Sequence, residues 1–218
     1  FLYTRELPSP DMFIEFSFYY IITSALQRRV WLPPLHQPIY PNIYVILVGK
    51  PGVGKGRILS EVARFLKFYK RNAIKQTPPP NDILQAMKDA QDFMRNSGFG
   101  HKEPEKKKRE DDLLIPVAAD STTLQALILA MGKNTDAVSY KDHNGQMKVY
   151  LHASTCFILE ELSSLFHKHG DGVNKFLLNM YDCKDYRYDN ISRGMDEIKS
   201  PCLNLIAGTS PGYMQEVF

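Results

Sequence analysis

Hydrophobic residues follow two patterns along this chain: short continuous runs, and longer segments with apolar positions three or four residues apart. The continuous runs have strand length and are typical of strands covered on both faces of a parallel sheet. They occupy residues 43–48, 113–118, 155–159 and 202–207. The segments with helical spacing or a helix-capping start occupy residues 11–32, 55–70, 81–96, 124–131 and 172–181. Because strands alternate with helices, the pattern predicts an α/β fold in which helices flank a central, mostly parallel sheet.

A β-hairpin insertion is expected before the third buried run. Residues 137–140 and 146–151 flank a turn that contains Asn-Gly, a dipeptide that suits a tight turn with positive φ. Residues 186–191 are expected to be extended. Residues 102–112 carry five basic and five acidic side chains, so their charges cancel. We interpret this stretch as a solvated loop rather than a DNA-binding tail.

Composition and charge narrow the class of protein. A chain of 218 residues can form one ordinary domain, or one domain with a small appendage. Its 44% hydrophobic and 23% charged residues are close to globular averages and exclude a disordered or collagen-like chain. The net charge of +3 is too small to predict nucleic-acid binding from bulk electrostatics, so any DNA contact must come from a local surface.

The cysteine pattern and the apolar segments bear on location. The cysteines are odd in number and widely spaced, at Cys156, Cys183 and Cys202. We interpret them as small buried residues in a reducing compartment, not as a disulfide framework or a zinc site. The most apolar stretch, residues 13–32, contains Glu15 and Gln-Arg-Arg at 27–29, which is too polar for a membrane span. We expect a cytoplasmic protein with no membrane partner, and, because the sequence lacks an initial Met, a piece of a longer polypeptide.

Residues 49–55, Gly-Lys-Pro-Gly-Val-Gly-Lys, lie between a predicted strand and a predicted helix. Glycines at these positions let the backbone curl so that several N–H groups point at phosphate oxygens, and the helix adds its positive N-terminal end. The Lys55 ammonium can reach the β- and γ-phosphates. The loop therefore predicts binding of ATP; the alternative is a structural turn with an incidental lysine. The residues expected to contact the nucleotide are Gly49, Pro51, Gly52, Val53, Gly54, Lys55, Gly56 and Arg57.

Mg²⁺ binding must depend on acids elsewhere, because Gly56 stands where a hydroxyl residue usually follows the lysine. Glu160 and Glu161 follow the third buried run, where a strand delivers carboxylates to the edge of a parallel sheet. We expect them to face the loop from the neighbouring strand. Glu160 would hold Mg²⁺ through water, and Glu161 would be the catalytic base that deprotonates an attacking water. The alternative is the acidic start of a helix over 162–167.

Hydroxyl and charged residues near other strand ends are further candidates. Thr209 and Ser210 follow the fourth buried run, where a hydroxyl could sense the γ-phosphate and hold the attacking water; capping of the next helix explains them equally well. Asp120 follows the second run and is more simply a helix cap. The histidines at 143, 152, 167 and 169 form no ligand pattern, and Arg187, Arg193 and Lys199 receive no role.

Several stretches together resemble the P-loop helicase-like domain of phage and plasmid replication proteins, which is often fused to a primase and was long catalogued as a domain of unknown function. These are residues 41–56, 120–127, 157–166, 176–182 and 201–211. The family pattern has Asp-Glu on the third strand, so Glu161 matches and Glu160 departs. The resemblance to RecA-like and AAA+ motors implies ATP hydrolysis at subunit interfaces, a homo-oligomer such as a hexameric ring, an arginine supplied by the neighbour, and single-stranded DNA as partner.

The expected organisation is an N-terminal helical segment over 1–40 that packs on the core, and a P-loop ATPase core over 41–218 whose C-terminal part is missing. The expected function is a replicative DNA helicase of a phage or mobile element. One alternative is a nucleotide-binding scaffold, and another is a DNA-packaging or transposition ATPase. A nucleoside monophosphate kinase is a further alternative, because adenylate kinases also have Gly after the lysine; their loop, however, begins near the N-terminus.

Overall fold

The computed structural model describes residues 9–33, 38–73, 124–133, 135–141, 144–166, 170–190 and 194–217. The predicted strand at 113–118, the predicted helix at 81–96 and the charged stretch at 102–112 lie outside these residues. The helices are α1 (Asp11–Leu26), the short 3-10 helix η1 (Gln27–Arg29), α2 (Lys55–Ala73), α4 (Leu124–Lys133), α5 (Ser163–Phe166), α6 (Gly170–Tyr181) and α7 (Pro211–Val217). The strands are β1 (Tyr44–Val48), β2 (Thr135–Lys141), β3 (Met147–Leu159), β4 (Tyr186–Asn190), β5 (Gly194–Ile198) and β6 (Pro201–Thr209).

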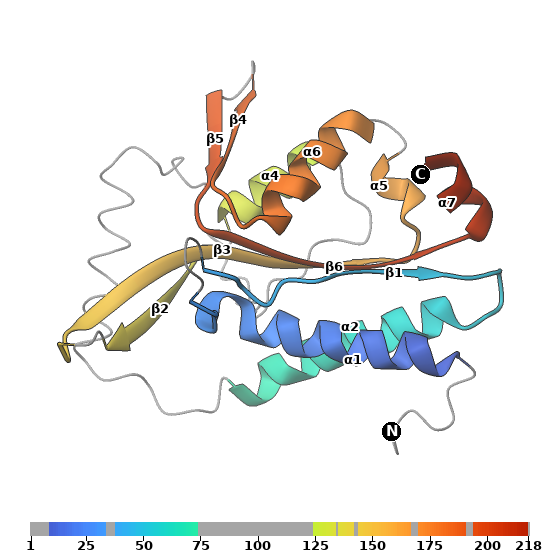
Figure 1. Cartoon of the computed structure of the whole chain (residues 1–218), viewed down its shortest axis with the longest axis horizontal. Coiled ribbons are helices and arrows are strands. Elements are labelled where there is room, and N and C mark those ends of the chain that lie inside the picture. The colour runs from blue at the N-terminus through green and yellow to red at the C-terminus, as the bar shows by residue number, and fades with distance from the viewer. Residues whose placement is uncertain are drawn as a thin grey trace.

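The central sheet has the strand order β1-β6-β3-β2. The β1–β6 and β6–β3 pairs are parallel, and β2 joins the sheet as the antiparallel partner of β3. Figure 1 shows the sheet edge-on, with α1 and α2 on one face and α4, α5, α6 and α7 on the other. The chain is therefore an α/β protein with a mostly parallel central sheet flanked by helices, as the sequence predicted.

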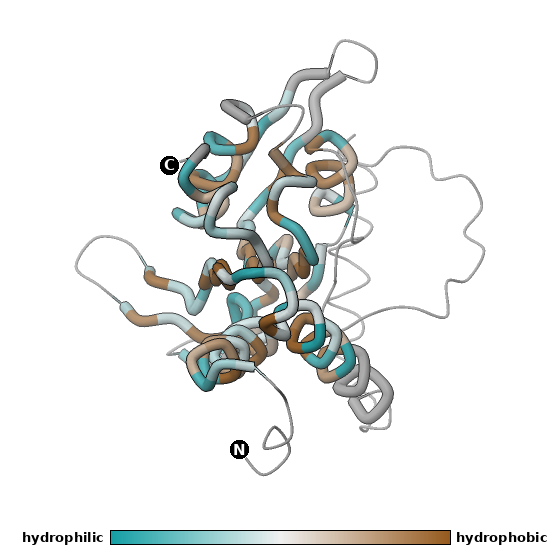
Figure 2. Tube along the Cα trace, turned by 90° about the vertical axis from the view of Figure 1, so that its right-hand side faces the viewer, coloured by the Kyte–Doolittle hydropathy of each residue, from teal (hydrophilic) through white to brown (hydrophobic). Residues whose placement is uncertain are grey.

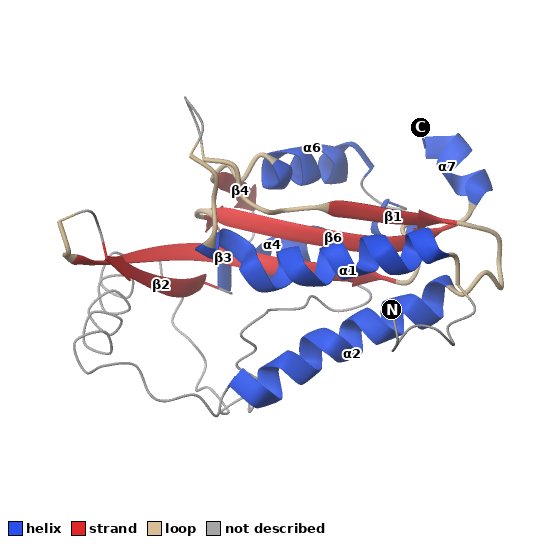
Figure 3. Ribbon diagram, turned by 60° about the horizontal axis from the view of Figure 1, so that its bottom comes forward, coloured by secondary structure: helices blue, strands red, loops and turns tan. Residues whose placement is uncertain are grey.

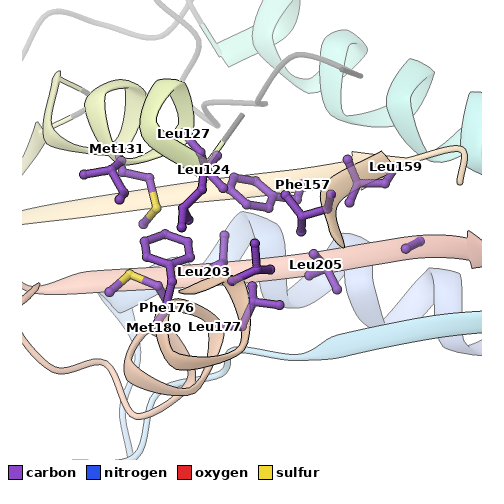
Figure 4. Packing of buried hydrophobic residues seen from close by; sticks show 14 of the residues in the cluster. Leu124, Leu127, Met131, Phe157, Leu159, Phe176, Leu177, Met180, Leu203 and Leu205 are labelled. Atoms are coloured by element: carbon purple, nitrogen blue, oxygen red, sulfur yellow. The ribbon is translucent and has the colours of Figure 1, made fainter. Parts of the chain in front are cut away.

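One face of the sheet is covered by α4 and α6. Their side chains interdigitate with those of β3 and β6, as Figure 4 shows. Phe157 and Phe176 are among the largest fully buried side chains of this layer. Successive residues of a strand point to opposite faces, so Leu203 and Leu205 belong to this layer whereas Ile206 belongs to the other.

The opposite face is covered by α1 and α2, which are neighbours, and α1 runs along the direction of the strands (Figure 3). Figure 2 looks nearly along these helices, and the hydrophobic residues that they share with the strands form one buried cluster. Tyr20 of α1 is fully buried there, and its hydroxyl donates to the backbone O of Phe157 at 2.9 Å. Burial raises the pKa of Tyr20 well above its ordinary value, so the phenol remains a donor. This bond joins α1 to β3.

The helix predicted over 11–32 is shorter in the structure, because α1 ends at Leu26. Gln27 has a φ of 51°, in the left-handed region that interrupts a helix. The turn directs Arg28 inward, where Nη1 donates to the backbone O of Pro201 at 3.2 Å and the guanidinium lies 4.0 Å from the ring centroid of Tyr40. The break thus joins the end of α1 to the start of β6.

One predicted strand assignment is also corrected. Residues 146–151 and 155–159 were expected as separate segments, but both belong to β3. The polar residues His152 and Ser154 lie between them in the core, and His152 Nδ1 and Ser154 Oγ form a hydrogen bond of 2.7 Å. The extended segment predicted near 186–191 is β4, and it pairs with β5, which the sequence pattern had not indicated. The hairpin predicted around 142–145 is the β2–β3 connection.

Candidate functional site

The predicted site residues meet at one edge of the sheet. In the parallel register Val48 lies beside Thr209, and Leu159 lies beside Ala207, so β1, β6 and β3 end at the same edge. The loop over 49–55 follows β1, the two glutamates follow β3, and Thr209 ends β6. The carboxyl edge of a parallel sheet is where ligands bind in open α/β folds.

The 49–55 loop has a backbone that glycine alone adopts readily. Gly52 and Gly54 have φ of 84° and 90°, in the region that disfavours side chains. A Cβ on Gly49 would lie 2.7 Å from Cγ1 of Val53, so the first glycine allows the loop to close on itself. Val53 N donates to the Lys50 carbonyl at 3.4 Å within this turn. Gly49, Gly52 and Gly54 are thus required by the loop's own geometry.

Lys55 is the first residue of α2, and its side chain folds back over the loop. Its Nζ donates to the backbone O of Gly49 and, at 3.1 Å, to that of Lys50. The ammonium is therefore held by carbonyl oxygens inside the curl, where phosphate oxygens would be stronger partners. Pro51 and Arg57 are exposed on either side, and Gly56 follows in the first turn of α2. A Cβ on Gly56 would meet no atom within 4 Å.

Thr209 connects the loop to the carboxylates. Its backbone O accepts the N–H of Gly49 at 3.1 Å, and its hydroxyl donates to Oε1 of Glu161 at 3.2 Å. Thr209 is fully buried, whereas the residues Glu160 and Glu161 are exposed. A single residue thereby holds the start of the loop with its main chain and a carboxylate with its side chain.

From the sequence we expected the glutamates to follow the strand next to β1. That expectation was wrong, because β6 is the neighbour of β1 and the glutamates follow β3. β6 lies between β1 and β3, so the carboxylates are two strand spacings, about 10 Å, from the strand that carries the loop. The turn after β3 is drawn in over β6, because Leu162 N donates to the Gly208 carbonyl at 2.8 Å.

Ser210 and Thr209 have different surroundings. Ser210 Oγ accepts the N–H of Tyr213 at 3.3 Å and caps α7, which begins with Pro211. Capping therefore explains Ser210, and Thr209 is the hydroxyl that contacts Glu161. The predicted alternative for the glutamates is also present in part, since the short helix α5 begins two residues after Glu161.

The remaining candidates lie away from this edge or outside the described residues. Outside the described residues are Asp120, Arg193 and the histidines at 143, 167 and 169. Arg187 and Lys199 both pair with Glu197, at 3.0 and 3.4 Å. His152 is buried, and burial lowers its pKa to about 4. None of these described side chains contributes to the site.

The donor atoms at the edge suit a phosphate and a hard cation. The loop carries backbone N–H groups and the Lys55 ammonium, and the Thr209 hydroxyl and the glutamate carboxylates lie at the same sheet edge, at the ends of β6 and β3. Within the described ranges, no group of three or more His, Cys, Asp and Glu side chains could hold a metal ion. Mg²⁺ would therefore share its coordination between Glu160, phosphate oxygens and water, as it does in many phosphate sites.

Three residues that support the site were missed by sequence reasoning. Gly208 allows the turn after β3 to approach β6, since a Cβ there would lie 2.6 Å from the Glu160 carbonyl O. A glycine inside a buried strand run is a signal of such close approach. Ser9 and Phe13 contact the loop from the start of α1. Ser9 lies two residues before α1 and far in sequence from the loop, so no local pattern indicated its contact with the loop.

These features define the class as an α/β protein with a glycine-rich loop, a carboxylate pair and a buried threonine at one sheet edge. No family model matches the chain, and the search of curated proteins finds no relative. Across the described ranges, none of the helices combines the length and the apolar character that crossing a bilayer requires.

Proposed function

We propose that this chain is a P-loop ATPase domain that binds ATP at residues 49–57 and hydrolyses it. The observation that carries the proposal is the bridge through Thr209, which links the loop at Gly49 to the carboxylate of Glu161. A structural glycine turn would not require a buried hydroxyl aimed at a carboxylate beyond it. Lys55 supplies a cation at the same place.

In the proposed reaction, the loop N–H groups and Lys55 hold the phosphates in line with an attacking water. Glu161 accepts a proton from that water while the water oxygen bonds to the γ-phosphorus. The bond between the γ-phosphorus and the β–γ bridging oxygen breaks, and ADP leaves. Thr209 orients the carboxylate through the hydrogen bond of 3.2 Å. Bound Mg²⁺, with Glu160 as its protein ligand, would neutralise charge on the phosphate oxygens.

Substituting Glu161 separates binding from turnover. For Glu161→Gln we expect ATP hydrolysis to fall by about 10²- to 10⁴-fold, the range for removal of a general base, with nearly unchanged ATP affinity. For Lys55→Ala we expect weaker ATP binding, because a charge-assisted contact to phosphate contributes about 1.5–3 kcal/mol. Glu160→Gln is the matched control; it should shift the Mg²⁺ requirement more than the catalytic rate. A rate for Glu161→Gln within threefold of wild type would contradict the proposed role.

The lack of a hydroxyl at Gly56 favours one second candidate, a nucleotide-binding scaffold without turnover. ATP binding with no hydrolysis by the wild-type chain would support the scaffold and exclude the ATPase. Phosphoryl transfer to AMP in a coupled assay would instead support the nucleoside monophosphate kinase.

The proposal extends to a replicative DNA helicase of a phage or mobile element, on the resemblance stated above. It then implies a homo-oligomer, such as a hexameric ring, that acts on single-stranded DNA in the host cytoplasm. Stimulation of hydrolysis by single-stranded DNA, followed by unwinding of a forked duplex, tests this extension. Hydrolysis that DNA stimulates without unwinding would favour a packaging or transposition ATPase.

A further inference from the structure

Ser9 contacts the 49–55 loop although 45 sequence positions separate it from its partner. Its Oγ donates to the backbone O of Gly54 at 3.2 Å. The same oxygen accepts the N–H of Ile58 at 3.2 Å, in the first turn of α2. The N-cap position of α1 is held by Pro10, and no side chain caps that helix. The Ser9 hydroxyl therefore serves the loop and not its own helix.

Phe13 adds a second contact from the first turn of α1. Atoms of its ring lie 3.4 and 3.6 Å from the position that a Cβ would take on Gly49. The ring packs where Gly49 has no side chain, so the two ends of the loop are both supported from α1. Ser9 holds the end at Gly54, and Phe13 backs the end at Gly49.

The contact with Gly54 has a geometric consequence for the next residue. The Gly54 carbonyl and the Lys55 N–H belong to one peptide unit, which is planar and trans, so the two groups point in opposite directions. A hydrogen bond that fixes the carbonyl also fixes the direction of the N–H. Gly54 has a φ of 90° and, lacking a side chain, little intrinsic restraint on the orientation of this unit. Ser9 and the α2 backbone provide the restraint.

We propose that Ser9 is a positioning residue for nucleotide binding: by holding the Gly54 carbonyl, it aims the Lys55 N–H at the phosphates of a nucleoside triphosphate. Donors that are fixed before the ligand arrives need no reorganisation on binding. This inference rests on the proposed ATP binding and assigns part of the nucleotide affinity to the segment before β1. Ser9 acts through the loop and touches no reacting atom.

The test compares Ser9→Ala with wild type, with Ser9→Thr as the conservative variant and Ser60→Ala as the matched control. Ser60 is exposed on α2, so the control also removes one serine hydroxyl but leaves the contacts of the loop unchanged. ATP and inorganic tripolyphosphate are titrated calorimetrically with each protein, and the Lys55 amide resonance is followed by ¹⁵N NMR without nucleotide. For Ser9→Ala we expect about three- to tenfold weaker binding of both ligands, the effect of one lost hydrogen bond.

The outcomes distinguish this inference from the proposed function. Equal weakening of ATP and tripolyphosphate, a shifted Lys55 resonance and recovery in Ser9→Thr support the positioning role. Wild-type affinity in Ser9→Ala, or a loss that Ser9→Thr does not restore, overturns it and leaves ATP binding intact. Weakening that is equally large in Ser60→Ala also overturns it. If the wild-type chain binds neither ligand, the proposed ATP binding is itself wrong, and the positioning role is excluded with it.

Discussion

Replacing Gly208 by alanine should slow ATP hydrolysis without weakening ATP binding. The added Cβ would lie 2.6 Å from the Glu160 carbonyl O, about 0.8 Å closer than the 3.4 Å at which ordinary contact begins. The nearest atom belongs to the backbone, so the side chains cannot simply turn away. The turn that carries Glu160 and Glu161 must move, or β6 must bend.

The size of the effect follows from that displacement. Misplacing a catalytic group by about 1 Å can lower the rate about 10²-fold, and overpacking a tight contact lowers stability by about 1–3 kcal/mol. For Gly208→Ala we therefore expect a kcat lower by one to two orders of magnitude. The loop over 49–55 is held by other contacts, including the Gly49–Thr209 bond of 3.1 Å, so the ATP dissociation constant should stay within about threefold.

Steady-state hydrolysis and a fluorescent-nucleotide titration measure the two quantities separately. Gly212→Ala is the matched control, because a Cβ at Gly212 would meet no atom within 4 Å. Thermal unfolding of both variants shows whether the fold is retained. A kcat for Gly208→Ala equal to that of Gly212→Ala would refute the argument that the close approach at Gly208 places the carboxylates. Loss of affinity and rate together would show that the loop had moved as well.

Two further predictions concern the metal ion and pH. For Gly56→Ser we expect hydrolysis to reach half its maximum at a several-fold lower Mg²⁺ concentration, because the Cβ has open space and the hydroxyl adds an oxygen ligand; an unchanged Mg²⁺ titration would contradict this. Burial lowers the pKa of His152 from 6.5 to about 4, so the stability that the neutral ring contributes is present above about pH 6.5 and is lost as pH falls towards 4. Thermal unfolding of wild type should therefore show a steeper loss of stability over this interval than that of His152→Gln, and parallel profiles would exclude His152 as the cause.

The sequence was sufficient to predict the strands of the core whose apolar runs are continuous. Residues 43–48 and 202–207 correspond closely to β1 and β6, because uninterrupted β-branched and aliphatic residues suit burial on both faces. β3 was divided at His152 and Ser154, since their mutual hydrogen bond is visible only in the structure. β5 has no apolar run, and its pairing with β4 is what makes it a strand.

Strand order and side-chain partners were less accessible from the sequence. All buried parallel strands have similar apolar runs, so nothing in residues 155–159 or 202–207 indicates which of them lies beside β1. The loop, the glutamates and Thr209 were nevertheless predicted to share an edge, because each follows a buried strand. The choice between Thr209 and Ser210 required coordinates, since both hydroxyls satisfy the same local pattern. The contact of Ser9 with Gly54 is long-range and leaves no local signal.

The first helix also has a practical meaning for anyone who prepares shorter versions of this protein. Ser9 just before it, Tyr20 within it and Arg28 just after it donate hydrogen bonds to backbone carbonyls. The acceptors are those of Gly54, Phe157 and Pro201, respectively. A fragment cut just before β1 would remove these three donors and uncover the part of the sheet face that α1 covers. Expression trials should therefore start upstream of Ser9, because the segment before β1 is hydrogen-bonded to the rest of the fold.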